Sequence, residues 1–300
     1  MAPDDVLQTT PQTLSRIQQE FYFENGYLLI ENAIDQQTLK RLREATAHAV
    51  EESCAITVSD AVWDLEPGHS AEDPRLRRLT SPNDYDDAYW AYASSTKVTD
   101  ILSDLIGPNI KFHHSKLNFK WAGGGEEVKW HQDISFWPHT NYTPCTVGLY
   151  LEDCDDEQGP LGVIGGSHKG RLFDQYNAQG QWVGCLSDED VARLDMSRAA
   201  YLPGPAGSIT IHNCRTVHGS KVNHSARPRP LLLNAYAAAD AMTYTFNPAV
   251  SRYDQKIVRG KAARWARHDP DPCLLPPDWS GGYTSIFSLQ QGSDTTPART

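Results

Sequence analysis

The sequence lacks any apolar run that approaches the roughly 20 residues of a membrane-spanning helix. Its first residues, MAPDDVLQTTPQ, contain neither the basic nor the apolar segment of a secretory signal. Six cysteines are scattered without any Cys-x-x-Cys spacing, which argues against a disulfide framework and against a structural zinc site. We therefore expect a cytoplasmic protein with reduced thiols and no membrane partner.

Positive charge is also scarce. The chain has 27 Lys and Arg residues against 38 Asp and Glu residues, and its formal net charge is −11. A nucleic-acid surface needs a basic patch, so the composition argues against a nucleic-acid partner while leaving room for a local basic pocket. With 39% hydrophobic and 10% aromatic residues, the 300-residue chain fits one globular domain over residues 1–300.

Helical periodicity dominates the N-terminal part. It predicts a helix over residues 12–25 that stops at Gly26, followed by a short strand over 27–30. Asp35 is a good N-cap for a second helix. The apolar residues of that helix recur in steps of three or four and give it one face for packing on a sheet: Leu39, Leu42, Ala45 and Ala49.

Two stretches break the regular pattern. Residues 53–93 are rich in Pro, Gly, Asp and Ser with isolated aromatics, and we expect a long loop there, either a lid over a pocket or a surface excursion without a role. An insert over residues 170–204 is expected to hold one helix, at 187–196. The polar tail, residues 290–300, is expected to be frayed.

A short helix over 97–106 precedes a β-rich region. Gly, Pro, Asp and Asn turns separate its strand-like runs, and many short strands of this kind suggest a sandwich or barrel. The expected class is mainly β with helices (α+β). The runs cover residues 110–121, 146–151, 162–164, 208–212 and 231–237.

Two residues that can bind a metal ion lie close together in the segment Trp130-His131-Gln132-Asp133. Iron(II) in many oxygenases is held by two histidines and one carboxylate, which leaves coordination positions open. In a strand, residues i and i+2 point to the same side, so His131 and Asp133 can bind one ion together. This is the only His-x-Asp in the sequence, although one match by itself is weak evidence.

The third ligand has three candidates: His212, His218 and His224. His218 stands out because it lies in a compact turn after a strand, and Gly219 lets the backbone pass close to a site. His212 fits better as an ordinary strand residue. His224 lies in a polar loop.

An arginine close to His218 supports the same site. If the cosubstrate is 2-oxoglutarate, its distal carboxylate needs a partner, and arginine pairs with carboxylates bidentately. Arg229 lies at the start of an apolar strand, where an unpaired charge is costly. Arg227 competes, since residues two apart in a strand point the same way, and parity does not separate the two.

Taken together, these residues resemble the phytanoyl-CoA dioxygenase family of iron(II)/2-oxoglutarate oxygenases, which includes ectoine hydroxylase. The resemblance covers about residues 21–237 and implies a double-stranded β-helix (jelly roll) with helices packed on one sheet. Each matching segment alone is unspecific, but their order and combination are specific. The segments are FYFENGYLLIENAID, WHQDISFWP, GPLGVIGGSHKG and HGSKVNHSARPRP.

The resemblance implies a set of site residues. His131, Asp133 and His218 become the iron(II) ligands, with 2-oxoglutarate and oxygen as cosubstrates. It favours Arg229 over Arg227 for the distal carboxylate of 2-oxoglutarate. Asn118 matches a position that often binds 2-oxoglutarate in the family.

The substrate is less well determined. Phe136 and Trp137 follow the iron motif and are the expected substrate-pocket residues, in keeping with a small organic substrate. The sequence departs from the family pattern at residues 53–93 and after about residue 244. The acidic composition gives no sign of a coenzyme A ester, and a carboxylate at position 133 favours hydroxylation over halogenation, because related halogenases lack it.

The expected activity is hydroxylation of a small organic metabolite, with release of succinate and carbon dioxide. Desaturation, epoxidation and cyclisation use the same chemistry and remain alternatives. A non-catalytic jelly-roll binding protein would have little need for an intact triad and Arg229. A metal-dependent hydrolase or isomerase would leave Arg229 without a cosubstrate to hold.

Overall fold

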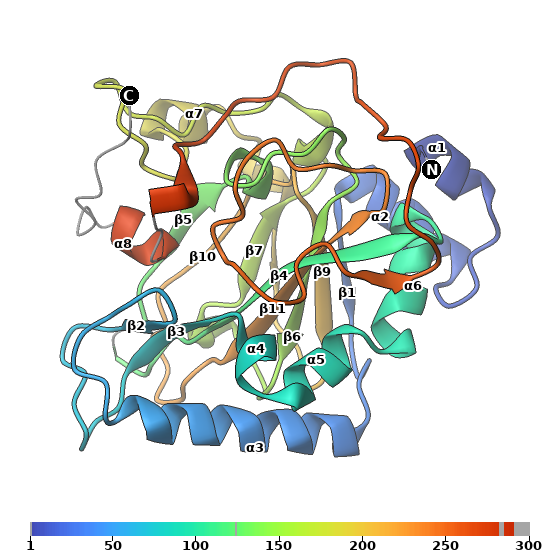
Figure 1. Cartoon of the computed structure of the whole chain (residues 1–300). Coiled ribbons are helices and arrows are strands. Elements are labelled where there is room, and N and C mark those ends of the chain that lie inside the picture. Colours follow the sequence, from blue (N-terminus) through green and yellow to red (C-terminus); the bar gives the residue numbers. More distant parts are fainter. Residues whose placement is uncertain (1, 124, 282–284, 291–300) are drawn as a thin grey trace.

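The computed structural model describes residues 2–123, 125–281 and 285–290. The chain folds into two antiparallel β-sheets with helices around them (Figure 1). Side chains of both sheets line one cavity. The larger sheet has eight strands and the smaller has four. The predicted class, mainly β with helices in a jelly roll, is confirmed.

The larger sheet carries most of the strands expected from the sequence. β1 has the predicted bounds. The four other predicted strands of this sheet begin and end within a few residues of their predicted bounds. In spatial order the strands are β1 (Tyr27–Ile30), β9 (Ile209–Asn213), β6 (Cys145–Tyr150), β11 (Leu231–Ala238), β4 (Ile110–Asn118), β3 (Leu76–Thr80) and β2 (Trp63–Leu65), with β12 (Ile257–Arg259) also paired to β4.

The smaller sheet is built from short strands. One of them ends at His131 of the His-x-Asp motif, and another begins at His218. Only β7 is among the strand-like runs expected from the sequence, although His131 and Asp133 were already expected to lie on a strand. Three- and four-residue strands give little periodic signal. In spatial order they are β5 (Val128–His131), β10 (His218–Ser220), β7 (Leu161–Ile164) and β8 (Ala199–Leu202).

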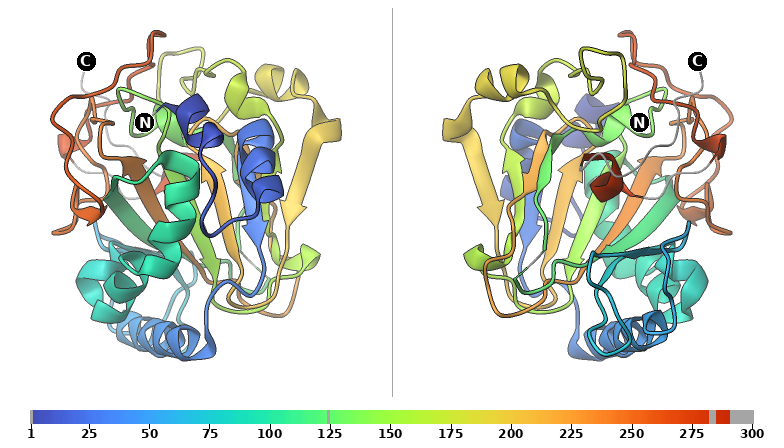
Figure 2. Two further views of the ribbon diagram at one scale, coloured as in Figure 1. Left: turned by 90° about the vertical axis from the view of Figure 1, so that its right-hand side faces the viewer. Right: turned by 90° about the vertical axis from the view of Figure 1, so that its left-hand side faces the viewer.

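Helices pack on the larger sheet, and α3 runs across the lower end of the molecule (Figures 1 and 2). Buried side chains of α2, α3, α5 and α6 share one apolar core with the larger sheet. Asp35 caps α3 by accepting the N–H of Thr38, and all four predicted apolar residues of α3 are buried. The helices before β4 are α1 (Pro3–Gln8), α2 (Arg16–Asn25), α3 (Gln36–Ser53), α4 (Pro82–Tyr85), α5 (Asp87–Ala93) and α6 (Thr96–Ile106).

The helix predicted over residues 12–25 is α2, and it begins later than predicted, at Arg16. Ser15 accepts the backbone N–H of Gln18, and the Gln18 side chain accepts the backbone N–H of Ser15, which makes a capping box. The helix ends where predicted, at Gly26, which has a left-handed φ of 80°.

The expectation of a long loop over residues 53–93 is wrong. This stretch forms β2, β3, α4 and α5, and β3 is buried throughout between β2 and β4. The sequence of β3, LRRLT, does not alternate between apolar and polar residues, so it gives no strand signal. Both of its arginines are buried in the structure, which the sequence alone did not suggest. A lid function for this stretch stays a prediction.

The insert at 170–204 is also more structured than expected. The predicted helix is only α7 (Asp188–Ala192), capped by Ser187, and the chain continues through a 3-10 turn (Met196–Arg198) into β8. The polar tail was expected from residue 290. Gln290 ends α8 (Ile286–Gln290), and residues 291–300 lie outside the described part.

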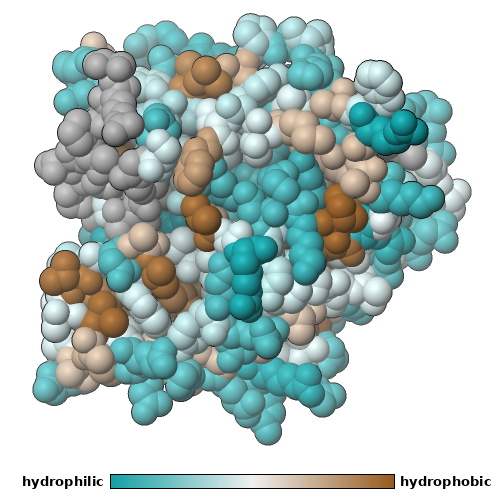
Figure 3. All heavy atoms as spheres, in the orientation of Figure 1, coloured by the Kyte–Doolittle hydropathy of each residue, from teal (hydrophilic) through white to brown (hydrophobic). Residues whose placement is uncertain are grey.

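Within the described residues, no helix combines the length and the apolar character needed to cross a bilayer. On the face seen in Figure 3, hydrophobic residues form small separate groups among hydrophilic ones. All six cysteines are free.

Candidate active site

The three predicted metal ligands come together where the two sheets meet. His131 ends β5, His218 opens β10, and the two residues are partners in the antiparallel register. Asp133 begins a 3-10 turn (Asp133–Ser135), but Gln132 keeps extended dihedral angles, so the alternation continues from His131 to Asp133. One ligand atom from each residue lies within 4.8 Å of the others, and all three side chains are buried.

Backbone carbonyls orient the two histidines. Nδ1 of His131 lies 2.8 Å from the carbonyl oxygen of Lys129, and Nδ1 of His218 lies 2.9 Å from that of Thr216. A carbonyl oxygen can only accept, so both Nδ1 atoms carry the proton. Each Nε2 is then free to bind a metal, the arrangement usual for metal-binding histidines.

Burial also sets the charge of the three groups. It lowers the pKa of His131 to about 4 and that of His218 well below its ordinary value, so both rings are neutral at pH 7. Burial alone would raise the pKa of Asp133, but His218, His212 and Lys116 together bring it well below its ordinary value. Two neutral imidazoles and one carboxylate are the donor set that iron(II) takes in oxygenases.

Two further side chains hold Asp133. The hydroxyl of Thr146 donates to Oδ2 at 2.7 Å, and Nε2 of His212 lies 3.2 Å from the same oxygen. The other oxygen, Oδ1, lies 3.8 Å from Nε2 of His218. His212 is thus a buried, hydrogen-bonded strand residue, as its sequence context suggested, whereas His224 is exposed.

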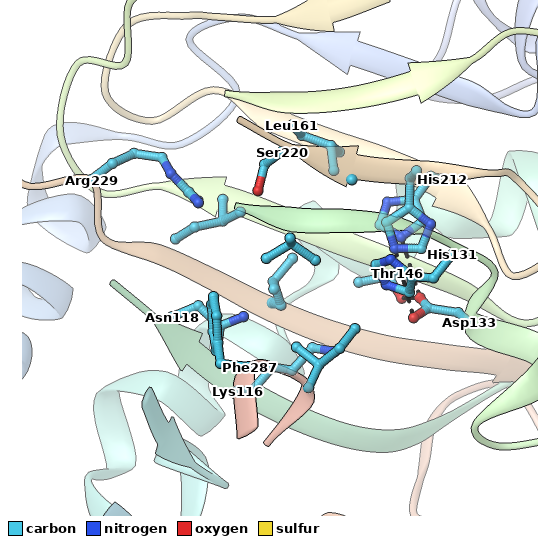
Figure 4. Close-up of a pocket in the computed structure, with 16 residues that line it drawn as sticks. Lys116, Asn118, His131, Asp133, Thr146, Leu161, His212, Ser220, Arg229 and Phe287 are labelled. Carbon is cyan, nitrogen blue, oxygen red and sulfur yellow. Dashed lines mark hydrogen bonds and ion pairs between the residues drawn. The ribbon is translucent and has the colours of Figure 1, made fainter. Parts of the chain in front are cut away.

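A cavity extends from the triad between the sheets to Arg229 (Figure 4). Arg229 is 4% exposed, and its Nε and Nη1 have no hydrogen-bond partner within the described part of the chain. Burial lowers its pKa, yet a guanidinium keeps its charge. A buried, unpartnered guanidinium facing a cavity fits a carboxylate from a bound molecule.

The competing arginine points elsewhere. Arg227 is exposed and donates to Asp155 at 2.5 Å and to Gln158 at 3.1 Å. Both arginines precede β11, so strand parity does not govern them. The structure therefore places Arg229, and not Arg227, in the cavity.

Two polar residues lie in the same cavity as Arg229. Asn118 was expected from the family resemblance, and its buried Oδ1 has no partner among the described residues. Ser220 was missed (Figure 4). A signal was available, since Ser220 is two residues from His218 and shares its side of β10.

A second, smaller compartment adjoins the triad. His131, Asp133 and Lys116 line both compartments. The predicted substrate residues Phe136 and Trp137 form a wall of the second one, and the Phe136 ring lies edge-on to His131 with centroids 5.8 Å apart.

Phe136 and Trp137 pack against residues from other segments, which had not been assigned to the site from the sequence. The ring of Trp182, in the 170–204 insert, packs edge-on against Phe136 at 5.2 Å between centroids. Nε1 of Trp279 donates to the carbonyl oxygen of Phe136 at 3.0 Å. Trp137 in turn packs against His113 and His114.

Comparison with known proteins agrees with this geometry. The family model described as phytanoyl-CoA dioxygenase matches residues 22–231. A probable alpha-ketoglutarate-dependent hypophosphite dioxygenase of Stutzerimonas stutzeri is 32% identical over 276 residues, covering 91% of this chain and 96% of the relative. The L-proline trans-4-hydroxylase of Streptomyces griseoviridis is 27% identical over 233 residues, covering 72% and 83%.

The fold has close counterparts among solved structures. EctD from S. alaskensis with bound Fe superposes with a TM-score of 0.66 at 22% identity, over 87% of this chain and 90% of that one. The matched family model spans more than half of the chain and includes all three triad residues. The chain belongs to the phytanoyl-CoA dioxygenase family and is an iron(II)- and 2-oxoglutarate-dependent dioxygenase.

Proposed function

We propose that His131, Asp133 and His218 hold the iron(II) and that Arg229 binds the distal carboxylate of 2-oxoglutarate. The observation that carries this assignment is one cavity with a neutral-neutral-anionic triad at one end and a buried, unpartnered guanidinium at the other. A hydrolase would use the triad but would leave Arg229 without a ligand. Ser220 and Asn118 line the cavity beside this path and can add hydrogen bonds to the cosubstrate.

The reaction inferred is insertion of one oxygen atom into a bond to hydrogen of a small molecule. Substrate, 2-oxoglutarate and oxygen give hydroxylated substrate, succinate and carbon dioxide, and the iron centre supplies the oxidising power. The chain's own residues set the geometry. Thr146 and His212 fix the Asp133 carboxylate, while Phe136 and Trp137 position the substrate and keep water out.

A second candidate reaction is oxidation at phosphorus. The relative from Stutzerimonas stutzeri is named for hypophosphite, whose P–H bonds would be oxidised with the same stoichiometry. Two basic residues, Lys116 and Arg78, line the second compartment and favour a small anion there. Desaturation, epoxidation and cyclisation would use the same centre, and product mass separates them: one added oxygen or two lost hydrogens.

The cosubstrate assignment is tested by anaerobic addition of iron(II) and 2-oxoglutarate, followed by a search for the weak visible charge-transfer band. We expect the band in the wild-type protein and in His224→Ala, which removes an exposed histidine. We expect no band in His218→Ala and a weakened or lost band in Arg229→Ala. Metal binding without any band would support the hydrolase reading, and a band unchanged in Arg229→Ala would rule out the role of Arg229.

A further inference from the structure

Two basic side chains line the second compartment, which Arg229 does not line. Lys116 comes from β4 and Arg78 from the neighbouring strand β3. Arg78 is 2% exposed, and Lys116 is partly buried. They line this compartment together with His131 and Asp133, so a group bound between them lies next to the metal site.

Lys116 lacks a protein partner among the described residues. Its ammonium makes no hydrogen bond or close ion pair with any residue that the structure describes. The acid that acts on it electrostatically is Asp133, and Arg78 opposes that attraction. Asp133 is already used by Thr146, by His212 and by the metal site. The ammonium is therefore available to a ligand.

Charge balance identifies the kind of ligand. In the loaded centre, the two positive charges of iron(II) and the one of Arg229 balance the two negative charges of 2-oxoglutarate and the one of Asp133. Lys116 is not needed for this balance. A partly buried ammonium is costly without a counter-charge, so its presence calls for an additional anion.

We propose that the substrate is a small molecule with an oxyanion group, which binds between Lys116 and Arg78 in the second compartment. This assignment rests on the proposed function and names the substrate class of that site. Phosphinate, phosphonate and carboxylate groups share the required chemistry, since each accepts charge-assisted hydrogen bonds from ammonium and guanidinium groups. Phe136 and Trp137 bound the compartment and restrict it to small substrates.

An alternative use of Lys116 is as a second cation for the cosubstrate, because this residue lines both compartments. The two uses predict different kinetic effects. A substrate lysine affects substrate binding and leaves the affinity for 2-oxoglutarate unchanged. A cosubstrate lysine affects 2-oxoglutarate binding first.

The test uses the anaerobic protein loaded with iron(II) and 2-oxoglutarate, with the charge-transfer band as readout. Phosphinate, methylphosphonate and acetate are titrated at constant ionic strength, with acetamide as the neutral comparison. We expect at least one anion to shift the band with saturation, and acetamide to have no effect. The anion that binds most tightly distinguishes a phosphorus oxyanion from a carboxylate.

Variants then assign the effect to Lys116. Lys116→Met, which replaces the aliphatic stem and removes the ammonium, should weaken anion binding about tenfold or more, while Lys116→Arg should restore much of it. Lys111→Met is the matched control, because Lys111 is a buried lysine on the same strand and lines neither compartment. Arg78→Lys, which keeps the charge, tests the second cation with less risk to folding than a neutral substitution.

Three outcomes overturn the inference. Anions that act no more strongly than acetamide would show that no anion subsite exists. Equal anion binding in Lys116→Met and the wild type would remove Lys116 from it. A loss of 2-oxoglutarate affinity in Lys116→Met, with anion binding unchanged, would assign Lys116 to the cosubstrate. If the band is absent from the wild-type protein, the proposed function itself fails, which is a distinguishable result.

Discussion

Nε2 of His212 lies 3.2 Å from Oδ2 of Asp133. Because an ionised carboxylate can only accept, the His212 ring donates this hydrogen bond. The Thr146 hydroxyl donates to the same oxygen, so Oδ2 is occupied by the protein and Oδ1 is the oxygen turned to the metal site. β6 and β9 bring the two donors together, since Thr146 and His212 are partners in their register.

Thr146→Val is therefore expected to weaken metal binding by about ten- to a hundredfold, the usual effect of removing a group that orients a metal ligand. The substitution keeps the side-chain shape and removes one donor to Asp133. Iron(II) or manganese(II) titration measures the effect, and thermal unfolding checks that the fold is kept. Thr210→Val is the matched control, since the Thr210 hydroxyl is buried on β9 without a partner among the described residues. Equal metal affinity in both variants would contradict the role of Thr146.

Arg229→Lys should raise the KM for 2-oxoglutarate by at least tenfold while leaving metal affinity unchanged. A lysine keeps the positive charge but cannot pair with a carboxylate through two parallel hydrogen bonds. Arg227→Lys serves as the control, because Arg227 is exposed and bonded to Asp155. Steady-state assays of succinate release check both variants, and similar KM changes in the two would show that the arginines were assigned wrongly.

Gly219→Ala should disturb both the sheet and the metal site. A Cβ at Gly219 would lie 2.7 Å from the carbonyl oxygen of Val128, so β10 would have to move away from β5. His218 precedes this glycine and would move with it. Overpacking of this kind costs about 1–3 kcal/mol. We expect lower stability in denaturant titration together with weaker metal binding.

Gly165→Ala is a suitable comparison for that experiment. The nearest atom to a Cβ at Gly165 is the end of the Asn25 side chain, at 3.3 Å, which can shift. It should cost less stability and leave metal affinity unchanged. A Gly219→Ala protein with wild-type metal affinity would show that His218 is insensitive to the β5–β10 spacing.

Local patterns in the sequence predicted those parts of the fold that local physics determines. The helix stripe of α3, the Asp35 cap and the strand Tyr27–Ile30 each depend on neighbouring residues, and the structure has them as expected. β3 could not be found in this way. Its Arg77 is buried because Asp64, on the next strand, accepts two hydrogen bonds from it, and this pairing depends on the register of β2 and β3.

The candidate site shows the same division. From the sequence and the family resemblance we expected His131, Asp133 and His218 to lie together and Arg229 to face them. The structure brings these residues to one cavity. The contacts of His212 and Thr146 with Asp133 arise from pairing between distant strands, which no local pattern reveals. Lys116 could have been noticed, because it has the same strand parity as Asn118.

The protein should lose stability as the pH falls below about 6.5, because several buried histidines besides the triad residues are neutral in the folded state. Burial lowers the pKa of His139 to about 4, and burial lowers that of His113 and of His114 well below the ordinary value. In the unfolded chain these rings take up protons near pH 6.5. The unfolded state then binds more protons, so the free energy of unfolding decreases as pH falls from about 6.5 towards 4. One such ring contributes a slope of about 1.4 kcal/mol per pH unit in this range.

Urea unfolding of the metal-free protein at pH 7.5, 6 and 5 measures this slope. His139→Gln should reduce this slope, because glutamine takes up no proton. The stability measured at pH 7.5 separates any packing cost of the substitution at His139 from its effect on the slope. A free energy of unfolding that stays constant between pH 7.5 and 5 would mean that these buried rings are protonated in the folded protein.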